Sequence, residues 1–144
     1  MVEQYLTWLK ARGFDPSDLE SRGFNGNTPL LQAALEGNAM MVSRLIDAGV
    51  NLYGLNNDHN GVLFNACYSD SESIIEMLIH AGADVDDVNE NGESALMYAA
   101  SASKLRSVKT LLRLGADKRI QNIDGLCAID FAVDREVFTY LRYA

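Results

Sequence analysis

The chain has 144 residues, of which 48% are hydrophobic and 22% are charged, and its formal net charge at pH 7 is −8. This length and composition are typical of one globular domain with a usable core. No apolar run approaches the roughly 20 residues that cross a bilayer, and Glu3 stands where a secretory signal would be basic. Two cysteines do not indicate a disulfide framework, so we expect a cytoplasmic protein without a membrane partner.

The first segment, residues 1–22, has apolar residues at helical spacing, among them Leu6 and Leu9, followed by Gly13. These residues echo Val42, Leu45 and Gly49 at a distance of 36 residues. We interpret the segment as a degenerate N-terminal cap in which Trp8 is packed.

From residue 23 onward the sequence repeats with a step of 33 residues. The step relates these columns: Ala33, Ala66, Ala99 and Ala132; Leu30, Leu63, Leu96 and Ile129; Val42, Ile75, Val108 and Leu141; Leu45, Leu78 and Leu111; Gly49, Gly82 and Gly115; Asn56, Asn89 and Asn122. A unit of this length cannot bury its own apolar side, so each unit must cover its neighbour. We predict one domain over 1–144, with repeats at 23–55, 56–88 and 89–121, a shortened repeat at 122–144, and all four alanines buried on helices.

Each unit is predicted to contain a turn and two helices. In the third unit, the turn at Asn91-Gly92 precedes a helix near 94–102, and a second helix covers about 105–114. Gly115 is expected to end that helix in a left-handed conformation. Ser94 and Thr28 are expected N-caps, and Pro29 suits the first position of a helix.

A β-hairpin is the competing local interpretation of the Asn-Gly pairs at 25–26, 60–61 and 91–92. The flanking residues follow a helical period and not strand alternation. We therefore predict tight turns that project from the stack, one for each repeat.

These columns resemble the ankyrin repeat. The family pattern is visible in NGNTPLLQAALEG with VSRLIDAGVN, and again in NGESALMYAAS with VKTLLRLGAD. The resemblance implies an all-α solenoid of stacked helix–turn–helix units joined by β-turn fingers. The Thr-Pro pair of the family is replaced by Gly61-Val62, Ser94-Ala95 and Cys127-Ala128. The family's His position holds Leu31, Phe64, Met97 and Asp130, and His59 stands where the second turn should have a glycine.

Catalytic and metal sites find little support in the residue pattern. DVNENG, residues 87–92, matches the start of a calcium-binding loop, but the position that needs a bidentate carboxylate is Tyr98. Cys67 and Cys127 lie too many repeats apart to pair, and neither has an assignable base. Two isolated histidines form neither a zinc site nor a catalytic dyad. We expect no cofactor and no enzymatic activity.

Charge is distributed unevenly along the chain. Ten acids and no lysine or arginine lie between Arg44 and Lys104. The acids are Asp47, Asp58, Asp70, Glu72, Glu76, Asp84, Asp86, Asp87, Glu90 and Glu93. A basic cluster from Lys104 to Arg119 follows. We place it mainly on the second helix of the third repeat, and we expect Lys104, Arg106 and Lys109 to lie on the convex side. This distribution argues against nucleic acid as the main partner, because phosphate binding needs a broad positive surface.

The ankyrin resemblance also implies a binding face, formed by the turn tips and the exposed side of the first helix of each repeat. Carried over by column, the expected partner-binding residues are Phe24, Asn25, Asn27, Leu35, Glu36, Asn57, Asp58, Asn60, Tyr68, Ser69, Glu90, Asn91, Glu93, Ser101, Ile123, Asp124, Leu126 and Asp134. This set contains acids and aromatic residues but no lysine or arginine. A merely solvated acidic surface is the alternative interpretation for a chain of this charge.

Two classes of function are compatible with the sequence. The first is a monomeric, non-catalytic module that binds a protein with a basic surface, in one version as an inhibitor or immunity-type protein that masks a basic enzyme site. The second is a calcium-dependent or enzymatic protein, which rests on DVNENG and the lone histidines. Fold alone does not decide between them.

Overall fold

The computed structural model describes residues 2–144 and contains eight α-helices and two short 3-10 helices in that range. These are α1 (Val2–Ala11), η1 (Phe24–Gly26), α2 (Pro29–Glu36), α3 (Ala39–Asp47), α4 (Val62–Tyr68), α5 (Glu72–His80), α6 (Ala95–Ser101), α7 (Leu105–Arg113), η2 (Ala128–Phe131) and α8 (Arg135–Tyr143). Over the described residues there is no β-strand, only an isolated bridge between Val88 and Ser94. The all-α prediction is therefore confirmed.

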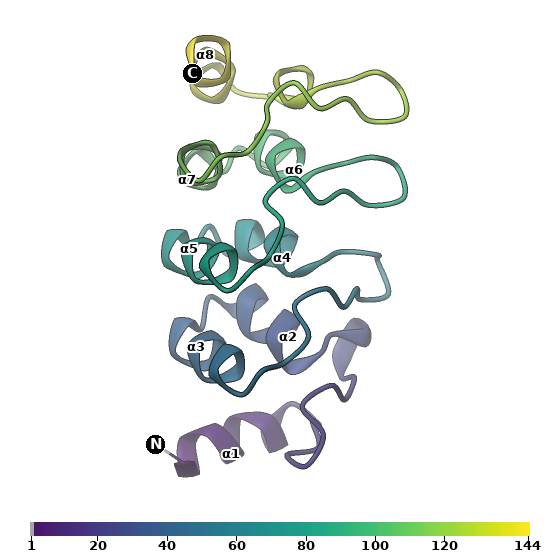
Figure 1. The fold of residues 1–144 in the computed structure, drawn as a ribbon, viewed down its shortest axis with the longest axis vertical. Coiled ribbons are helices and arrows are strands. Elements are labelled where there is room, and N and C mark those ends of the chain that lie inside the picture. The colour runs from purple at the N-terminus through teal and green to yellow at the C-terminus, as the bar shows by residue number, and fades with distance from the viewer. Residues whose placement is uncertain (1) are drawn as a thin grey trace.

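The helices are stacked as pairs along one axis (Figure 1). Helices α2, α4, α6 and η2 form an inner row, and α3, α5, α7 and α8 form an outer row. Four loops project beyond the inner row on the side away from the outer row. We call them fingers 1 to 4, at residues 23–27, 56–60, 89–93 and 122–126. In each finger, the N–H of the first residue donates to the carbonyl of the fifth, at 2.8–3.1 Å.

Local sequence explains where the helices begin. The Thr28 hydroxyl accepts a hydrogen bond from the Leu31 N–H, the Ser94 hydroxyl accepts one from Met97, and Pro29 occupies the first turn of α2. Gly115 follows α7 with φ of +103°, a conformation that glycine adopts without a Cβ clash. These caps are the ones that the sequence predicts.

Fingers 2, 3 and 4 are each organised by the asparagine of the repeated Asn column. Asn56, Asn89 and Asn122 each use Oδ1 to accept two backbone N–H groups of the same finger, at 2.9–3.0 Å. Asparagine suits this role because its short side chain reproduces a backbone turn. The DVNENG sequence thus contributes its central asparagine to an inter-repeat turn, as the equivalent asparagines do in the other two fingers.

The core runs through the stack without a break between repeats. Ala33, Ala66 and Ala99 are 0% exposed, as are Leu45, Leu78 and Leu111 of the outer row. Small alanine side chains let neighbouring inner helices approach closely, and α2 packs on α4, which packs on α6. Trp8 is buried in the cap and stacks on Phe14, as expected.

The fourth repeat departs from the prediction. Its first helix is the four-residue 3-10 helix η2, and Ala132 follows it in an extended conformation, only partly buried. The prediction that all four alanines lie buried on helices is therefore wrong for Ala132. There is no further inner helix on its outer side to cover it in the described chain, so this residue lacks the packing that orders the other three.

A cross-repeat contact replaces one missing helix cap. Lys104 precedes α7 and provides no side-chain cap. Asp70, in the loop of the preceding repeat, accepts hydrogen bonds at Oδ1 from both the N–H and the hydroxyl of Ser107, at 3.0 and 2.7 Å. A free N–H of the first turn of α7 is thus satisfied by the neighbouring repeat.

Replacement of Leu111 by alanine tests the repeat register. The side chain is fully buried, so we expect the free energy of unfolding to fall by about 2–5 kcal/mol through lost burial and a residual cavity. Chemical denaturation measures this change. Leu112→Ala, at a half-buried position of the same helix, is the control and should lose clearly less. A loss below about 0.5 kcal/mol at Leu111 would contradict the register.

Finger 2 carries backbone strain that glycine should relieve. His59 has φ of +61°, and the same column holds Gly26, Gly92 and Gly125, all at positive φ. A left-handed non-glycine residue costs about 1–2 kcal/mol, partly offset by the greater unfolded-state entropy of glycine. We expect His59→Gly to stabilise the protein by roughly 0.5–1 kcal/mol in thermal or chemical unfolding.

Gly92→Ala, in the same column of finger 3, is the matched reverse experiment. Its φ is +74°, and an added Cβ would lie 3.1 Å from the Asn122 Cα, so this variant should be destabilised. A stabilised Gly92→Ala, or a destabilised His59→Gly, would show that strain in this column does not limit stability.

Candidate partner-binding surface

Two adjoining hollows lie between the fingers and the inner helices, and together we call them the concave groove. The first has a volume of about 200 Å³ and is lined by seven of the residues predicted for binding: Phe24, Asn25, Asn27, Leu35, Asp58, Asn60 and Tyr68. The second, of about 140 Å³, includes the predicted residues Asn60, Glu93 and Ser101. The predicted residues Glu36, Asn57, Ser69, Glu90, Asn91, Ile123, Asp124, Leu126 and Asp134 do not line either hollow.

Sequence reasoning missed an aromatic pair in the floor of this groove. Phe64 lines both hollows, as does Tyr98, and their ring centroids are 5.6 Å apart. A signal was available, because Phe64 precedes Tyr68 by four residues and therefore lies on the same helix face. Tyr98 belongs to a column with Gln32, Asn65 and Phe131 that the 33-residue step relates. Asn65, Tyr98 and Phe131 of this column line the groove.

Large apolar side chains are exposed both in the first hollow and in finger 4. Phe24 in finger 1 is 82% exposed, Tyr68 at the end of α4 is 58% exposed, and Ile123 in finger 4 is 71% exposed. Leu126 is 40% exposed. Side chains of this size so accessible to solvent are candidates for contact with another molecule.

Two predicted binding residues serve the fold instead. Asn27 is only 1% exposed; its amide donates to Gln32 Oε1, and its Oδ1 accepts from Asn56. The expectation of a solvent-facing Asn27 is therefore wrong, because its side chain joins finger 1 to finger 2. The Ser69 hydroxyl donates to the Ala34 carbonyl at 2.8 Å and links α4 to α2.

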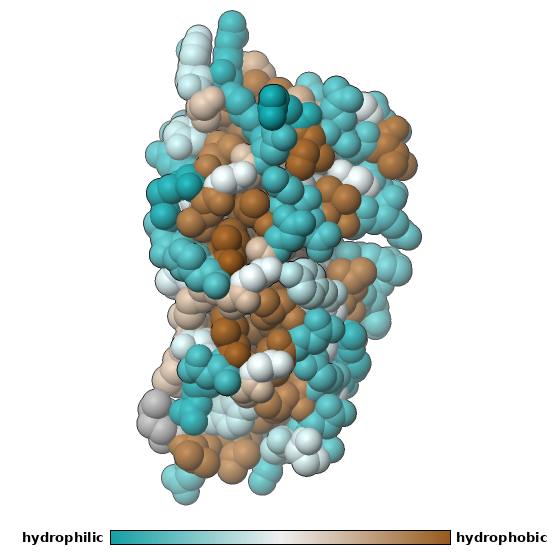
Figure 2. All heavy atoms as spheres, viewed as in Figure 1, coloured by the Kyte–Doolittle hydropathy of each residue, from teal (hydrophilic) through white to brown (hydrophobic). Residues whose placement is uncertain are grey.

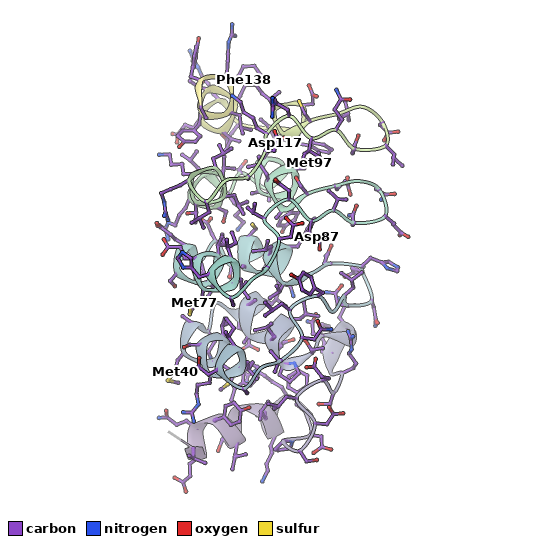
Figure 3. The ribbon with its side chains drawn as sticks, in the orientation of Figure 1. Met40, Met77, Asp87, Met97, Asp117 and Phe138 are labelled. Atoms are coloured by element: carbon purple, nitrogen blue, oxygen red, sulfur yellow. The ribbon has the colours of Figure 1, made fainter. Side chains whose placement is uncertain are left out.

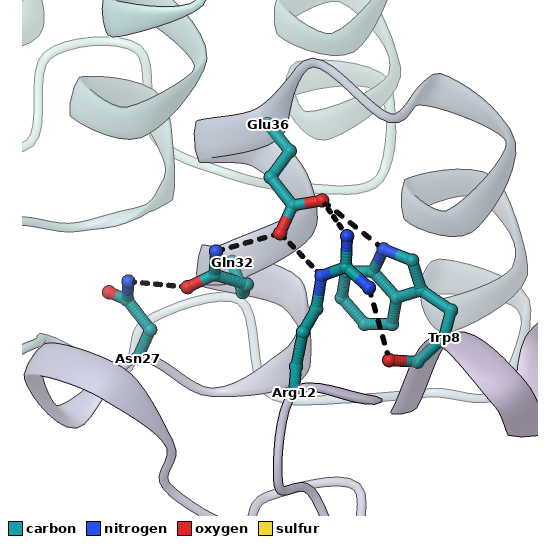
Figure 4. Close-up of polar contacts among 5 residues, drawn as sticks. All are labelled: Trp8, Arg12, Asn27, Gln32 and Glu36. Carbon is teal, nitrogen blue, oxygen red and sulfur yellow. Dashed lines mark hydrogen bonds and ion pairs between the residues drawn. The ribbon is translucent and has the colours of Figure 1, made fainter. Parts of the chain in front are cut away.

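Glu36 is not a free acid but the anchor of the N-terminal cap (Figure 4). Its carboxylate accepts hydrogen bonds from Arg12 Nε and Nη2 at 2.6 and 2.7 Å, from Gln32 Nε2 at 2.7 Å and from Trp8 Nε1 at 3.3 Å. Burial raises the pKa of Glu36, but the hydrogen bonds from Arg12, Gln32 and Trp8 outweigh it, so the net pKa lies below the ordinary value.

The remaining acids of the predicted face differ in availability. Asp134 caps α8 by accepting the Val137 N–H at 2.8 Å, and this backbone hydrogen bond lowers its pKa. Asp58 accepts from the Asn25 amide, and Glu93 accepts from the Asn89 amide. Within residues 2–144, the carboxylates of Glu90 and Asp124 make no hydrogen bond, so these two are the least committed to the fold.

The predicted face also contains a cation that column matching placed elsewhere. Lys104 Nζ lies 5.7 Å from the ring centroid of Tyr68, a cation–π distance. The expectation that Lys104 belongs to the convex side is therefore wrong, because it precedes α7 and reaches the end of α4. Arg106, Lys109 and Arg113 do lie on α7 in the outer row.

Of the two cysteines considered as candidate nucleophiles, Cys67 is buried and Cys127 is half-buried. Burial raises the pKa of the Cys67 thiol to about 12, which keeps it protonated and unreactive near neutral pH. Cys67 and Cys127 are both unpaired thiols. In the part of the chain that the structure describes, no three histidine, cysteine, aspartate or glutamate side chains come together in a way that could hold a metal ion.

No helix formed by the described residues has both the length and the apolar character needed to span a bilayer.

The stacked helix pairs with projecting turns define a helical repeat scaffold. The chain matches the family model for ankyrin repeats (3 copies) over residues 2–89 and 63–143, and it belongs to the ankyrin-repeat family. As such it is a protein–protein interaction module, and this fold is generally a non-catalytic scaffold. No curated protein matches the chain in sequence.

A solved structure supports the same assignment. The chain is similar to the ankyrin repeat domain of Bcl-3, described as a unique member of the IkappaB protein family, with a TM-score of 0.76 and 30% sequence identity. The match covers 90% of this chain and 58% of the Bcl-3 chain, so this chain spans little more than half the length of that relative.

The Glu36 network should make stability depend on pH. A carboxylate with a lowered folded-state pKa contributes stability that is fully present above its unfolded pKa and is lost as pH falls through the folded pKa. With an ordinary value of 4.5, the loss should begin below about pH 4.5. We expect Glu36→Gln to destabilise the protein by about 1 kcal/mol at pH 7 and by progressively less in acid.

Urea unfolding at several pH values measures this difference. Glu90→Gln removes an unbonded carboxylate and should change stability by less than about 0.5 kcal/mol at pH 7. A Glu36→Gln variant as stable as the wild type at pH 7 would mean that the network does not anchor the cap.

Proposed function

We propose that the chain binds a protein partner with a basic surface in the concave groove. The observation that carries this proposal is the groove itself. It combines an aromatic floor, Phe64 and Tyr98, with the exposed rings of Phe24 and Tyr68 at its edge. Aromatic side chains in such positions supply contact area at a low cost in conformational entropy.

The charges around the groove favour a basic partner. Glu90 and Asp124 lie in fingers 3 and 4 without a hydrogen-bond partner in the described chain, and Asp58 and Glu93 are shared only with neutral amides. Lys104 and Arg12 reduce the negative potential at Tyr68 and Glu36. We therefore propose that the acids of fingers 2 to 4 attract the basic partner, because charges at the rim of an interface mainly steer association. The aromatic residues of the groove then hold the bound partner.

This proposal is for a non-catalytic function, exercised as a monomer in the cytoplasm and without nucleic acid as the main partner. Burial of Cys67 and the use of Asn89 Oδ1 in its own turn support this choice over the enzymatic or calcium-dependent alternative. An inhibitor or immunity-type protein that masks a basic enzyme site is the sharper version. It would use the same groove and is distinguished by loss of the enzyme's activity on binding.

Comparative capture from a native lysate tests the proposal. The wild type is compared with Tyr68→Ala, with Glu90→Lys plus Asp124→Lys, and with the outer-row control Arg106→Glu plus Lys109→Glu. We expect the first two variants to capture less of the protein that the wild type captures, and the outer-row control to capture as much of it as the wild type. Binding kinetics should then show faster dissociation for Tyr68→Ala, about 30-fold for a 2 kcal/mol anchor, and slower, less salt-dependent association for the double lysine variant.

The opposite pattern would overturn the proposal. If the outer-row variant loses the partner while both groove variants keep it, the binding face is the convex one. Circular dichroism of each variant separates lost binding from lost fold.

A further inference from the structure

Two rows of hydrogen bonds tie neighbouring repeats together outside the helices. In the finger row, the Asn57 N–H donates to the Asn25 carbonyl at 2.9 Å, and the Ile123 N–H donates to the Asn91 carbonyl at 3.0 Å. The equivalent pair between fingers 2 and 3 is Glu90 N–H and Asp58 carbonyl. In the described chain, this N–H and this carbonyl do not form a hydrogen bond with each other. The row is therefore broken between fingers 2 and 3.

The row formed by the linkers before each finger changes at the same junction. Glu20 accepts the Asn51 N–H, and Asp86 accepts the Asp117 N–H, both at 2.9 Å. In the column between them stands Tyr53, whose hydroxyl donates to the Gly82 carbonyl at 2.7 Å. A phenol ring thus stands where the other two junctions have a short carboxylate, and the Asp84 N–H has no side-chain acceptor equivalent to theirs.

A cavity occupies this junction. It lies between fingers 2 and 3 and has a volume of about 40 Å³, enough for roughly three or four water-sized groups. Leu52, Leu55, Val62 and Val88 contribute apolar walls. Figure 2 shows apolar side chains gathered in the middle of the molecular face in view, with hydrophilic ones on both sides. Phe64 and Asn89 line both this cavity and the concave groove, so the two are neighbours.

Two carboxylates belong to the lining of the cavity. Asp84 uses Oδ1 to accept the Asp86 N–H, and Asp87 uses Oδ1 to accept the Val88 N–H. The second oxygen of each makes no hydrogen bond to the described chain, and both residues are exposed. Figure 3 places Asp87 on the linker that leads into finger 3. Neither lysine nor arginine contributes to this lining, although His59 does.

We propose that the cavity between fingers 2 and 3 receives a lysine side chain of the protein partner, with its methylenes against the apolar walls and its ammonium beside Asp84 and Asp87. The apolar walls suit the methylenes of a lysine stem, and the compact ammonium at its end suits the carboxylates of Asp84 and Asp87, which belong to the same lining. That the lysine belongs to a protein partner rests on the proposed function above. That the cavity binds an alkylammonium group does not depend on the proposed function.

The other junctions lack this combination. The columns of Asp84 and Asp87 hold Asn51 and Gly54 one repeat earlier, and Asp117 and Ile120 one repeat later. Asp117 is already paired with Arg119 at 3.1 Å. Charge complementarity to a lysine is therefore confined to the junction where both hydrogen-bond rows are altered.

Titration of the ¹⁵N-labelled chain with small probes, followed by amide chemical shifts, tests this inference without a partner. We expect n-butylammonium to shift the amides of His59, Val88 and Ala95 with millimolar affinity. Both n-butanol, which lacks the positive charge, and methylammonium, which lacks the four-carbon alkyl chain, should bind more weakly. The double variant Asp84→Asn plus Asp87→Asn should weaken n-butylammonium binding by about fivefold or more.

Two controls keep the result interpretable. Asp47→Asn in α3 and Glu136→Gln in α8 each remove an exposed outer-row carboxylate that lines neither the cavity nor the groove; both should leave n-butylammonium binding unchanged. The inference is overturned if n-butanol or methylammonium binds equally well, if the shifts fall elsewhere, or if the double variant binds as the wild type does. If n-butylammonium does not bind but the partner still binds in the groove, the lysine inference is wrong and the proposed function is unaffected. If n-butylammonium binds in the cavity but no partner binds in the groove, the proposed function is wrong and the cavity's affinity for an alkylammonium group is unaffected.

Discussion

The fold depends on one constraint, which is that no 33-residue unit can bury its own apolar side. Each unit must therefore stack on the next, and the spacing of the stack is set by what lies between the inner helices. Ala33, Ala66 and Ala99 are fully buried there, so α2, α4 and α6 approach closely and carry their fingers in step. Where this packing ends, the helix shortens to η2 and Ala132 becomes partly accessible.

Polar side chains refine this stack rather than drive it. The asparagines of fingers 2 to 4 each satisfy two backbone N–H groups, and Asp70 caps a helix of the next repeat. These contacts occur in repeats that lack the family's Thr-Pro pair and its His residue. Because buried polar groups are costly unless bonded, such local solutions allow an irregular sequence to keep a regular architecture.

The surface charge is less uniform than the chain's net charge suggests. Arg12 neutralises Glu36, Lys104 lies over Tyr68, and Asp134 is committed to a helix cap. What remains is a groove with an aromatic floor and a few uncommitted carboxylates on fingers 3 and 4. Phe64 belongs both to this groove and to a neighbouring cavity that has apolar walls and is also lined by Asp84 and Asp87. In the function we propose, a basic partner protein contacts both.

The repeat step, the helix pairs, the turns and most helix caps follow from the sequence alone. They follow because they are local or periodic: an apolar column every 33 residues, a Pro after a Thr, a Gly after the last helical turn. The fold class and the family could thus be predicted from these columns, and so could the irregularity of finger 2, because His59 occupies a glycine column.

Only the tertiary structure decided which side chains are free to bind. Column matching placed Asn27, Glu36 and Asp134 on the surface, but Asn27 is buried against finger 2, Glu36 is bonded to the cap, and Asp134 is bonded to the Val137 backbone. It also placed Lys104 on the wrong side and missed Phe64 and Tyr98. The physical reason is that a repeat pattern specifies the position of each backbone unit, whereas the availability of a side chain depends on contacts with residues about one repeat away whose identities the pattern leaves open.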